Sequence, residues 1–347
     1  MTLRELYCSF FLLTVDLRPE VAASRRAVVG HLEKLTAMGY TGFDLPVSPR
    51  TAPIGGHGGP AEHAREIEAY RELRAAIEDA GLGHVGITTN VAATTAFDPS
   101  SADPDHRSSA LDYLKSRVDI TAVLGGRVMA GPIVFPYNVF PAAGSGEPLW
   151  SRALQDWLAA GYERARPAIA ELAEYAEPRG VKVAIEPVDR WEQPSPNSVR
   201  DVLDFLEGVP SRNVGVCPDS AHVAMGDDGP AAFAADVGRA TNQERLHYVH
   251  VSAPGRGAVR DSWIQWDRFL EPVLARYDGP LLIETFNAIP VFYAPLHLVR
   301  RKFWVPGEDE PDPGTPDAYT VARESLAEVR EQLERLEGRE NAVDAGR

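Results

Sequence analysis

Cysteine is scarce in this chain, which has only Cys8 and Cys217 among 347 residues. Two cysteines cannot build a disulfide framework, so the composition is typical of a reducing compartment, and we expect a cytoplasmic protein. Long apolar runs are also missing. The stretch SFFLLTV at residues 9–15 is too short for a membrane span or the core of a signal peptide. We therefore expect a soluble protein without a membrane partner.

Positive charge is in deficit. The chain has 35 lysines and arginines against 50 aspartates and glutamates, which gives a net charge of −15. Nucleic-acid binders usually present a basic face, so this balance argues against a nucleic-acid partner. Two nucleotide-binding motifs are also absent from the sequence: no G-x-G-x-x-G follows the first predicted strand, and there is no P-loop.

Short apolar runs alternate with helical patterns along the whole chain. Eight runs are typical of strands buried on both faces, at residues 6–15, 41–48, 83–91, 126–134, 181–188, 213–220, 246–253 and 279–287. Amphipathic patterns predict helices at residues 24–38, 66–80, 150–175, 198–207, 266–277 and 318–337. Eight such units favour an α/β fold that forms a single (β/α)8 TIM barrel over residues 1–347, with an open doubly wound sheet as the alternative.

Three connections are longer than a minimal barrel needs. They cover residues 50–64, 135–148 and 287–316, and all three follow predicted strands. We expect them to extend the C-terminal rim of the barrel, where active sites of this fold lie. The rim extension at 288–317 is unusually apolar and aromatic for a connection. We predict that residues 288–307 either cover the mouth of the barrel or form a surface for another chain.

Ionisable side chains stand at the ends of the last four predicted strands. The fifth strand ends at Glu186, the sixth continues into Asp219, the seventh contains His250, and the eighth ends at Glu284. In a parallel barrel these ends lie side by side, so three carboxylates and an imidazole should converge. Carboxylates packed this closely repel each other and take up protons unless a cation compensates them. The donor set suits a divalent metal ion, with manganese, cobalt, magnesium, iron or zinc as candidates.

The same stretches resemble a known family. IEPVDRWE at 185–192, PDSAH at 218–222, HVSAPGR at 250–256 and IETF at 283–286 are similar to motifs of the xylose-isomerase-like sugar isomerases and epimerases. Within that superfamily they resemble the D-tagatose/D-psicose (allulose) 3-epimerases. The resemblance implies one metal ion, manganese in the first place with cobalt, magnesium or iron as alternatives, held by Glu186, Asp219, His250 and Glu284. It implies substrate contacts from Glu192, His222 and Arg256.

The C-terminal part departs from the small epimerases, which lack a counterpart of residues 288–317. In length and in this tail the chain looks more like the α-subunits of C-glycoside deglycosidases, which cleave 3-oxo-glycosides together with a small β-subunit. This second resemblance implies a hetero-oligomer with such a subunit, and a homo-oligomer is the alternative.

Both resemblances imply one chemistry on a sugar or glycoside. The metal would stabilise the enediolate that forms when a carbon next to a ketone loses its proton. Glu186 and Glu284 would be the catalytic pair, one removing the proton and the other returning it from the opposite face. Return of the proton epimerises the carbon, whereas loss of a β-leaving group gives the deglycosidase outcome. A sugar-binding barrel without activity is the alternative of another class, and it would be expected to lose one of these glutamates.

Overall fold

A computed structural model describes most of the chain. The described residues are 4–13, 17–47, 60–141, 151–226, 229–260, 262–286, 303–306 and 314–344. Within them, no helix is long and apolar enough to cross a membrane.

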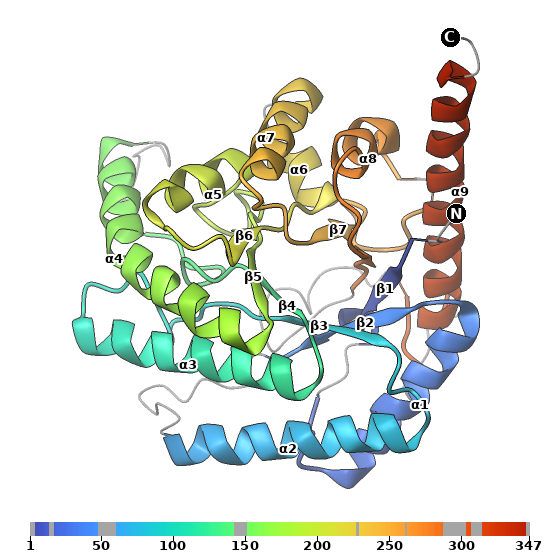
Figure 1. Cartoon of the computed structure of the whole chain (residues 1–347), viewed down its shortest axis with the longest axis horizontal. Helices are drawn as coiled ribbons and strands as arrows, with labels where there is room; N and C mark the ends of the chain where they lie inside the picture. The colour runs from blue at the N-terminus through green and yellow to red at the C-terminus, as the bar shows by residue number, and fades with distance from the viewer. Residues whose placement is uncertain are drawn as a thin grey trace.

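Eight parallel strands form the centre of the molecule (Figure 1). Each lies inside the range that the sequence predicts and is shorter than that range: β1 Leu6–Ser9, β2 Gly42–Pro46, β3 Gly86–Asn90, β4 Val128–Gly131, β5 Lys182–Ile185, β6 Val214–Val216, β7 Val249–Val251 and β8 Leu281–Ile283. The sheet order is β6-β5-β4-β3-β2-β1-β8-β7. Parallel bridges of Val216 with Leu246 and of Asp219 with His250 join the two outer strands. The fold is the predicted (β/α)8 TIM barrel.

Helices surround the strands (Figure 1). They are α1 Ala22–Met38, α2 Pro60–Asp79, α3 Pro104–Val123, α4 Arg152–Ala176, α5 Val199–Phe205, α6 Ser220–Gly226, α7 Pro230–Asn242, α8 Trp266–Leu274 and α9 Ala318–Asp344. The six predicted helices are present, but the sequence reading missed α3, α6 and α7. The start of α3 carried a recognisable signal, because Asp103 caps it by accepting a hydrogen bond from the Asp105 amide and Pro104 follows the cap.

Several predicted boundaries are wrong. The first strand ends at Ser9 rather than at residue 15, and Phe10–Leu13 form a 3-10 turn. Here the Ser9 hydroxyl accepts a hydrogen bond from the Phe11 amide, which gives the backbone a local alternative to the strand ladder. The predicted loop at 50–64 also ends early, since α2 begins at Pro60. The last helix runs beyond its predicted end at residue 337, to Asp344.

The interior of the barrel is filled by side chains. A cluster of Tyr7, Val128, Ala130, Ala184, Cys217, Tyr248 and Leu282 packs inside the ring of strands. The larger apolar core lies between the strands and the helices. Because this interior is packed, a ligand cannot enter the barrel itself, and the end where the strands finish is the expected place for a site, as in other barrels of this type.

Most of the apolar rim segment predicted at 288–307 lies outside the described residues. Residues 303–306 of the segment are described. Phe303 is fully buried and Val305 is 8% exposed, and both pack into the main core. Backbone hydrogen bonds join Trp304 to Pro316 and Ala318 at the start of α9. At these positions the segment covers its own barrel, and the partner surface stays a prediction for the remainder.

Candidate active site

The four predicted metal ligands converge at the C-terminal ends of β5 to β8. Each of them offers one donor atom, and all four donor atoms lie within 4.8 Å of one another. All four side chains are almost completely buried, and these residues are Glu186, Asp219, His250 and Glu284. Because neighbouring parallel strands end at the same level, residues at the ends of consecutive strands lie close together in space.

Hydrogen bonds hold the ligand side chains in place. His250 Nδ1 lies 3.0 Å from Glu186 Oε1 and 3.8 Å from Glu284 Oε1. Asp219 Oδ1 accepts hydrogen bonds from the amides of Ala221 and His222 in the first turn of α6, at 2.7 and 3.0 Å. The Ser252 hydroxyl donates to the same carboxylate at 2.7 Å. The site is therefore built on strand ends and backbone amides, which are rigid parts of the barrel.

Proton affinities in the cluster are strongly perturbed. Burial, followed by repulsion from Glu186, raises the pKa of Glu284 to about 8. Burial also opposes ionisation of Asp219, but Arg256 and the neighbouring imidazoles outweigh it and lower the pKa of Asp219 to about 2. For His250, burial favours the neutral ring, yet Cys217 and Glu186 prevail and raise its pKa well above the usual value. The three carboxylates therefore share the positive charges of Arg256 and of the neighbouring imidazoles.

This donor set fits a divalent metal ion. Three carboxylates and one imidazole offer oxygen and nitrogen, the ligands of hard and borderline cations. Cys217 is the nearest thiol, and burial raises its pKa to about 12, so it stays protonated and is a poor metal ligand. The cluster could therefore hold a metal through the four predicted residues without a thiolate.

A second group of potential ligands lies beside the first. Asp189, Glu192 and His222 also bring donor atoms within 4.8 Å of one another. Here a guanidinium already supplies the positive charge, because Arg256 Nη2 lies 2.7 Å from His222 Nε2 and 3.6 Å from Glu192 Oε1. The positive charge that a second metal ion would bring to this group is therefore already supplied by Arg256.

Arg256 stands between the two groups. Its Nη1 lies 3.4 Å from Asp219 Oδ2 and 3.3 Å from Glu284 Oε2, and its guanidinium packs 4.8 Å from the centre of the Phe286 ring. Burial works against its charge, but Asp219, Glu192 and Glu284 raise the pKa of Arg256, so it remains a cation. The backbone of Arg256 is left-handed, with φ of 57°, a strained conformation typical of functional sites.

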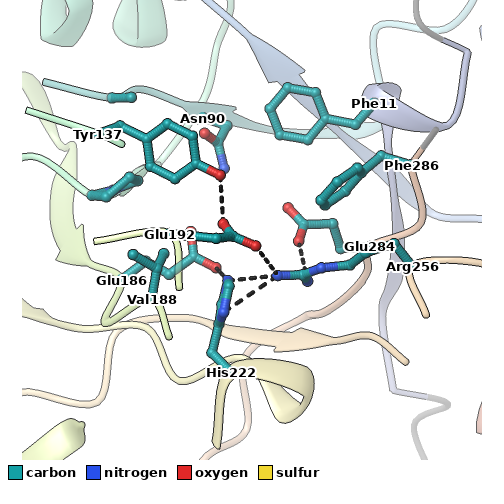
Figure 2. A pocket seen from close by; sticks show the side chains of 12 residues that line it. Phe11, Asn90, Tyr137, Glu186, Val188, Glu192, His222, Arg256, Glu284 and Phe286 are labelled. Atoms are coloured by element: carbon teal, nitrogen blue, oxygen red, sulfur yellow. Dashed lines mark hydrogen bonds and ion pairs between the residues drawn. The ribbon is translucent and has the colours of Figure 1, made fainter. Parts of the chain in front are cut away.

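The predicted substrate contacts open onto one pocket at the C-terminal rim of the barrel. Figure 2 shows how Glu192, His222 and Arg256 meet in it. Glu186 and Glu284 reach the same pocket, whereas Asp219 and His250 are not part of its wall. The other lining residues are Phe11, Asn90, Ala92, Pro132, Tyr137, Val188 and Phe286.

Sequence reasoning missed several polar or aromatic members of the site, Phe11 among them. Asn90 is the last residue of β3, so the strand-end rule that found Glu186 could also have found it. Tyr137 lies in the extension at 135–148 that was predicted to reach the rim, and its hydroxyl donates a hydrogen bond to Glu192. Phe286 lies two residues after Glu284. Asp189 lies three residues after Glu186, and its carboxylate is 3.0 Å from His222 Nδ1.

The fold and this site define a class of protein, a TIM barrel with an acidic, histidine-containing cluster at its C-terminal rim. The chain belongs to the xylose isomerase-like TIM barrel family, whose profile matches residues 32–301. It is an enzyme of the sugar isomerase and epimerase superfamily.

Named relatives are ketose epimerases. The chain is 26% identical to a ketose 3-epimerase of Arthrobacter globiformis over 217 residues, 62% of this chain and 68% of that protein. It is 28% identical to an L-ribulose 3-epimerase of Mesorhizobium japonicum over 215 residues, 61% of this chain and 65% of that protein. These matches confirm the predicted resemblance to 3-epimerases, whereas the comparisons lend no support to the deglycosidase resemblance.

Among solved structures, a protein of Anabaena variabilis is 48% identical and superposes with a TM-score of 0.88, covering 96% of this chain and 99% of its own. It carries only a provisional description as a sugar phosphate isomerase/epimerase. The D-allulose 3-epimerase of Methylomonas sp. in complex with D-allulose is 20% identical, with a TM-score of 0.73 over 95% of this chain and 97% of its own. At that identity the second likeness concerns the fold alone.

Proposed function

We propose that this protein is a divalent-metal-dependent ketose 3-epimerase. The observation that carries the proposal is the pair Glu186 and Glu284, which project from β5 and β8 into one pocket and share a cluster with Asp219 and His250. A 3-epimerase needs two proton-transfer groups on opposite faces of one carbon, and two buried carboxylates from separate strands meet this need. The names of the relatives support the same reaction.

Glu186, Asp219, His250 and Glu284 would hold one metal ion, with manganese as the first candidate and cobalt, magnesium or iron as alternatives. When bound, the ion would supply Lewis-acid stabilisation of negative charge on the substrate oxygens. Two of these ligands, Glu186 and Glu284, also face the pocket, so the protein would orient them for coordination and for proton transfer together.

The proton transfer belongs to the two glutamates. One carboxylate removes the proton from C3 of the ketose, and the electron pair that is left behind gives an enediolate with the neighbouring carbonyl. The other glutamic acid returns a proton to C3 from the opposite face, which inverts that carbon and restores the ketone. The two residues exchange roles when the reaction runs in reverse.

The remaining contacts orient the sugar. Arg256 donates hydrogen bonds to substrate oxygens, Glu192 accepts from a hydroxyl, and His222 lies between them. The pocket favours a neutral ketose over a sugar phosphate. Arg256 is the one guanidinium among the described lining residues, and it is already paired with Asp219, Glu284 and Glu192. A phosphate would add charge next to these carboxylates.

Proton–deuterium exchange separates the candidate reactions. The purified protein is incubated with Mn²⁺ in D2O and offered ketohexoses, L-ribulose and 3-oxo-glucosides, and each sugar is followed by NMR. Deuterium at C3 of a ketose, with appearance of its 3-epimer, is the expected result. Release of an aglycone from a 3-oxo-glycoside without ketose exchange would favour the deglycosidase. Ketose binding without any exchange would favour the sugar-binding barrel.

The deglycosidase alternative depends on the composition of residues 288–317, and no described contact adds to it, so we do not propose it. Association with a second copy or with a small β-subunit stays a prediction of the same segment. Light scattering of the chain alone and with proteins encoded beside it tests that prediction.

A further inference from the structure

Asn90 is a buried polar side chain that the proposed chemistry does not use. It is the last residue of β3, it is 7% exposed, and it lines the same pocket as Glu186 and Arg256. Its backbone is held by the strand ladder, through pairing with Pro46 and Ala130. Among the described residues, none forms a hydrogen bond with its side-chain amide. The amide lines the pocket, so a group that enters can replace water as its hydrogen-bond partner.

The amide restricts the chemistry of that group. A primary amide both donates and accepts hydrogen bonds, which matches a hydroxyl group and does not favour an anion. Apolar side chains make up much of the pocket lining, namely Phe11, Ala92, Pro132, Val188 and Phe286. In such surroundings a hydrogen bond to a neutral group is stronger than in water, and a substrate that cannot form it leaves the amide unpaired.

The position of Asn90 in the barrel separates it from the reacting centre. The four ligand candidates come from β5 to β8, whereas Asn90 comes from β3, which is two strands from β5 and four strands from β7 around the ring. Tyr137, in the connection after β4, is the other polar side chain on this part of the pocket (Figure 2). Its proton is donated to Glu192, so its oxygen retains acceptor capacity for a substrate hydroxyl. Two polar groups thus face the part of the sugar away from the metal ligands.

We propose that Asn90, together with Tyr137, forms a subsite that binds a hydroxyl group of the ketose beyond the reacting carbon, at C4, C5 or C6. Asn90 is a specificity-determining residue in this proposal, and Glu186 and Glu284 keep the proton transfer. The inference rests on the proposed ketose substrate, but it concerns recognition rather than reaction.

The test combines variants of Asn90 with sugars that lack single hydroxyl groups. Binding of D-psicose and of its 4-deoxy, 5-deoxy and 6-deoxy analogues is measured by calorimetry on the Mn²⁺-loaded protein, and C3 exchange is measured in parallel. Asn90→Leu keeps the size of the side chain and removes its hydrogen bonds. Asn90→Ser keeps a smaller polar group in case the leucine variant does not fold. Asn242→Leu, at the exposed end of α7, makes the same change away from the pocket.

We expect Asn90→Leu to bind D-psicose about 10- to 100-fold more weakly, the scale of an unpaired buried group. For one deoxy analogue, the dissociation constants of the wild type and of this variant should agree within about threefold. The missing hydroxyl and the missing amide remove the same contact, so the second change adds no further loss. The serine variant should lie between wild type and leucine, and the Asn242 variant should match the wild type.

Equal losses for all four sugars would show a structural role for Asn90 and overturn the subsite, as would no loss for any of them. If the pattern appears without C3 exchange, the 3-epimerase proposal fails and the subsite stands. A wild-type protein that binds none of the four sugars contradicts both.

Discussion

At the scale of single residues, Glu186 and Glu284 have identical side chains and equal burial, and both face the pocket. Replacing either with glutamine keeps the shape and one metal-binding oxygen but removes the group that takes up a proton. We expect Glu186→Gln and Glu284→Gln each to lower turnover by ~10²-fold or more, the usual scale for a lost general acid or base. Epimerisation rates, with metal content measured on the same samples, check this.

Glu177→Gln is the matched control, because Glu177 is exposed in the turn after α4. It should leave the rate unchanged. Near-normal turnover of either site variant with the metal in place would remove that glutamate from the proton-transfer role.

Asp189 acts through a neighbour. An arginine is always a donor, so His222 Nε2, 2.7 Å from Arg256 Nη2, must accept. His222 Nδ1 lies 3.0 Å from Asp189 Oδ2 and 3.0 Å from the Asp189 amide nitrogen, so the charged carboxylate favours a proton on Nδ1 in competition with this N–H. The other oxygen of Asp189 accepts from the Trp191 amide at 2.8 Å. Asparagine cannot accept at both positions, so Asp189→Asn should disturb the ring and the guanidinium that rests on it.

We expect Asp189→Asn to raise KM by about 10-fold, the cost of one misplaced charge-assisted hydrogen bond, without a loss of bound metal. The ¹⁵N NMR signals of His222 should show a smaller fraction of the Nδ1–H form. Asp103→Asn makes the same change at a helix cap where asparagine serves equally well, and it should have no effect. An unchanged tautomer together with an unchanged KM would exclude this positioning role.

At the scale of elements, the end of β4 holds the backbone of Glu186 in position. The Glu186 amide donates to the Gly131 carbonyl at 3.0 Å. Gly131 has φ of 135°, and a Cβ there would lie 2.1 Å from the Val91 carbonyl oxygen. Gly131→Ala therefore combines backbone strain with a clash against the neighbouring strand, and we expect it to cost about 3 kcal/mol or more.

Gly180→Ala is the informative comparison, because Gly180 also has a left-handed φ, of 67°, but an added Cβ would meet no atom within 4 Å. Only strain of about 1–2 kcal/mol is expected there. Urea unfolding of both variants gives the two values, and similar losses would contradict the role of the Val91 contact.

At the scale of the whole molecule, stability and metal binding are linked through pH. The pKa of Glu284 is raised to about 8, far above an ordinary carboxyl group. Stability that comes from its bound proton is present at low pH and is lost as pH rises through about 8. The raised pKa of His250 acts in the same direction. A metal ion replaces these protons, so Mn²⁺ should raise the Tm more at pH 8.5 than at pH 6.

Below pH 8, the affinity for the metal should rise about tenfold per unit of increasing pH for each proton that the metal displaces. Calorimetry at several pH values measures this slope, and differential scanning calorimetry with and without Mn²⁺ measures the Tm change. The Glu284→Gln variant has lost one of the protons and should show a shallower slope. A Tm increase that is the same at pH 6 and pH 8.5 would contradict the linkage.

The sequence by itself determined the barrel and the identity of the main cluster. Eight buried apolar runs separated by helical patterns leave few architectures open. In a parallel barrel the order of strand ends in the chain is also their order in space. Glu186, Asp219, His250 and Glu284 could therefore be grouped before any coordinates existed. The helix α3 was missed because its weakly amphipathic pattern shows no clear apolar stripe. The capping sequence Asp103-Pro104 at its start could have indicated it.

Only the tertiary structure decided which side chains support that cluster. The link from Tyr137 to Glu192 joins residues 55 positions apart, and that from Asp189 to His222 joins residues 33 apart. The left-handed backbone of Arg256 turns its guanidinium across the pocket, and none of the described residues forms a hydrogen bond with the Asn90 side chain there. Contacts of this kind depend on loop paths and side-chain rotamers that the packing of the whole barrel selects. Hydrophobic periodicity records which face of an element is buried, but not which distant side chain meets it.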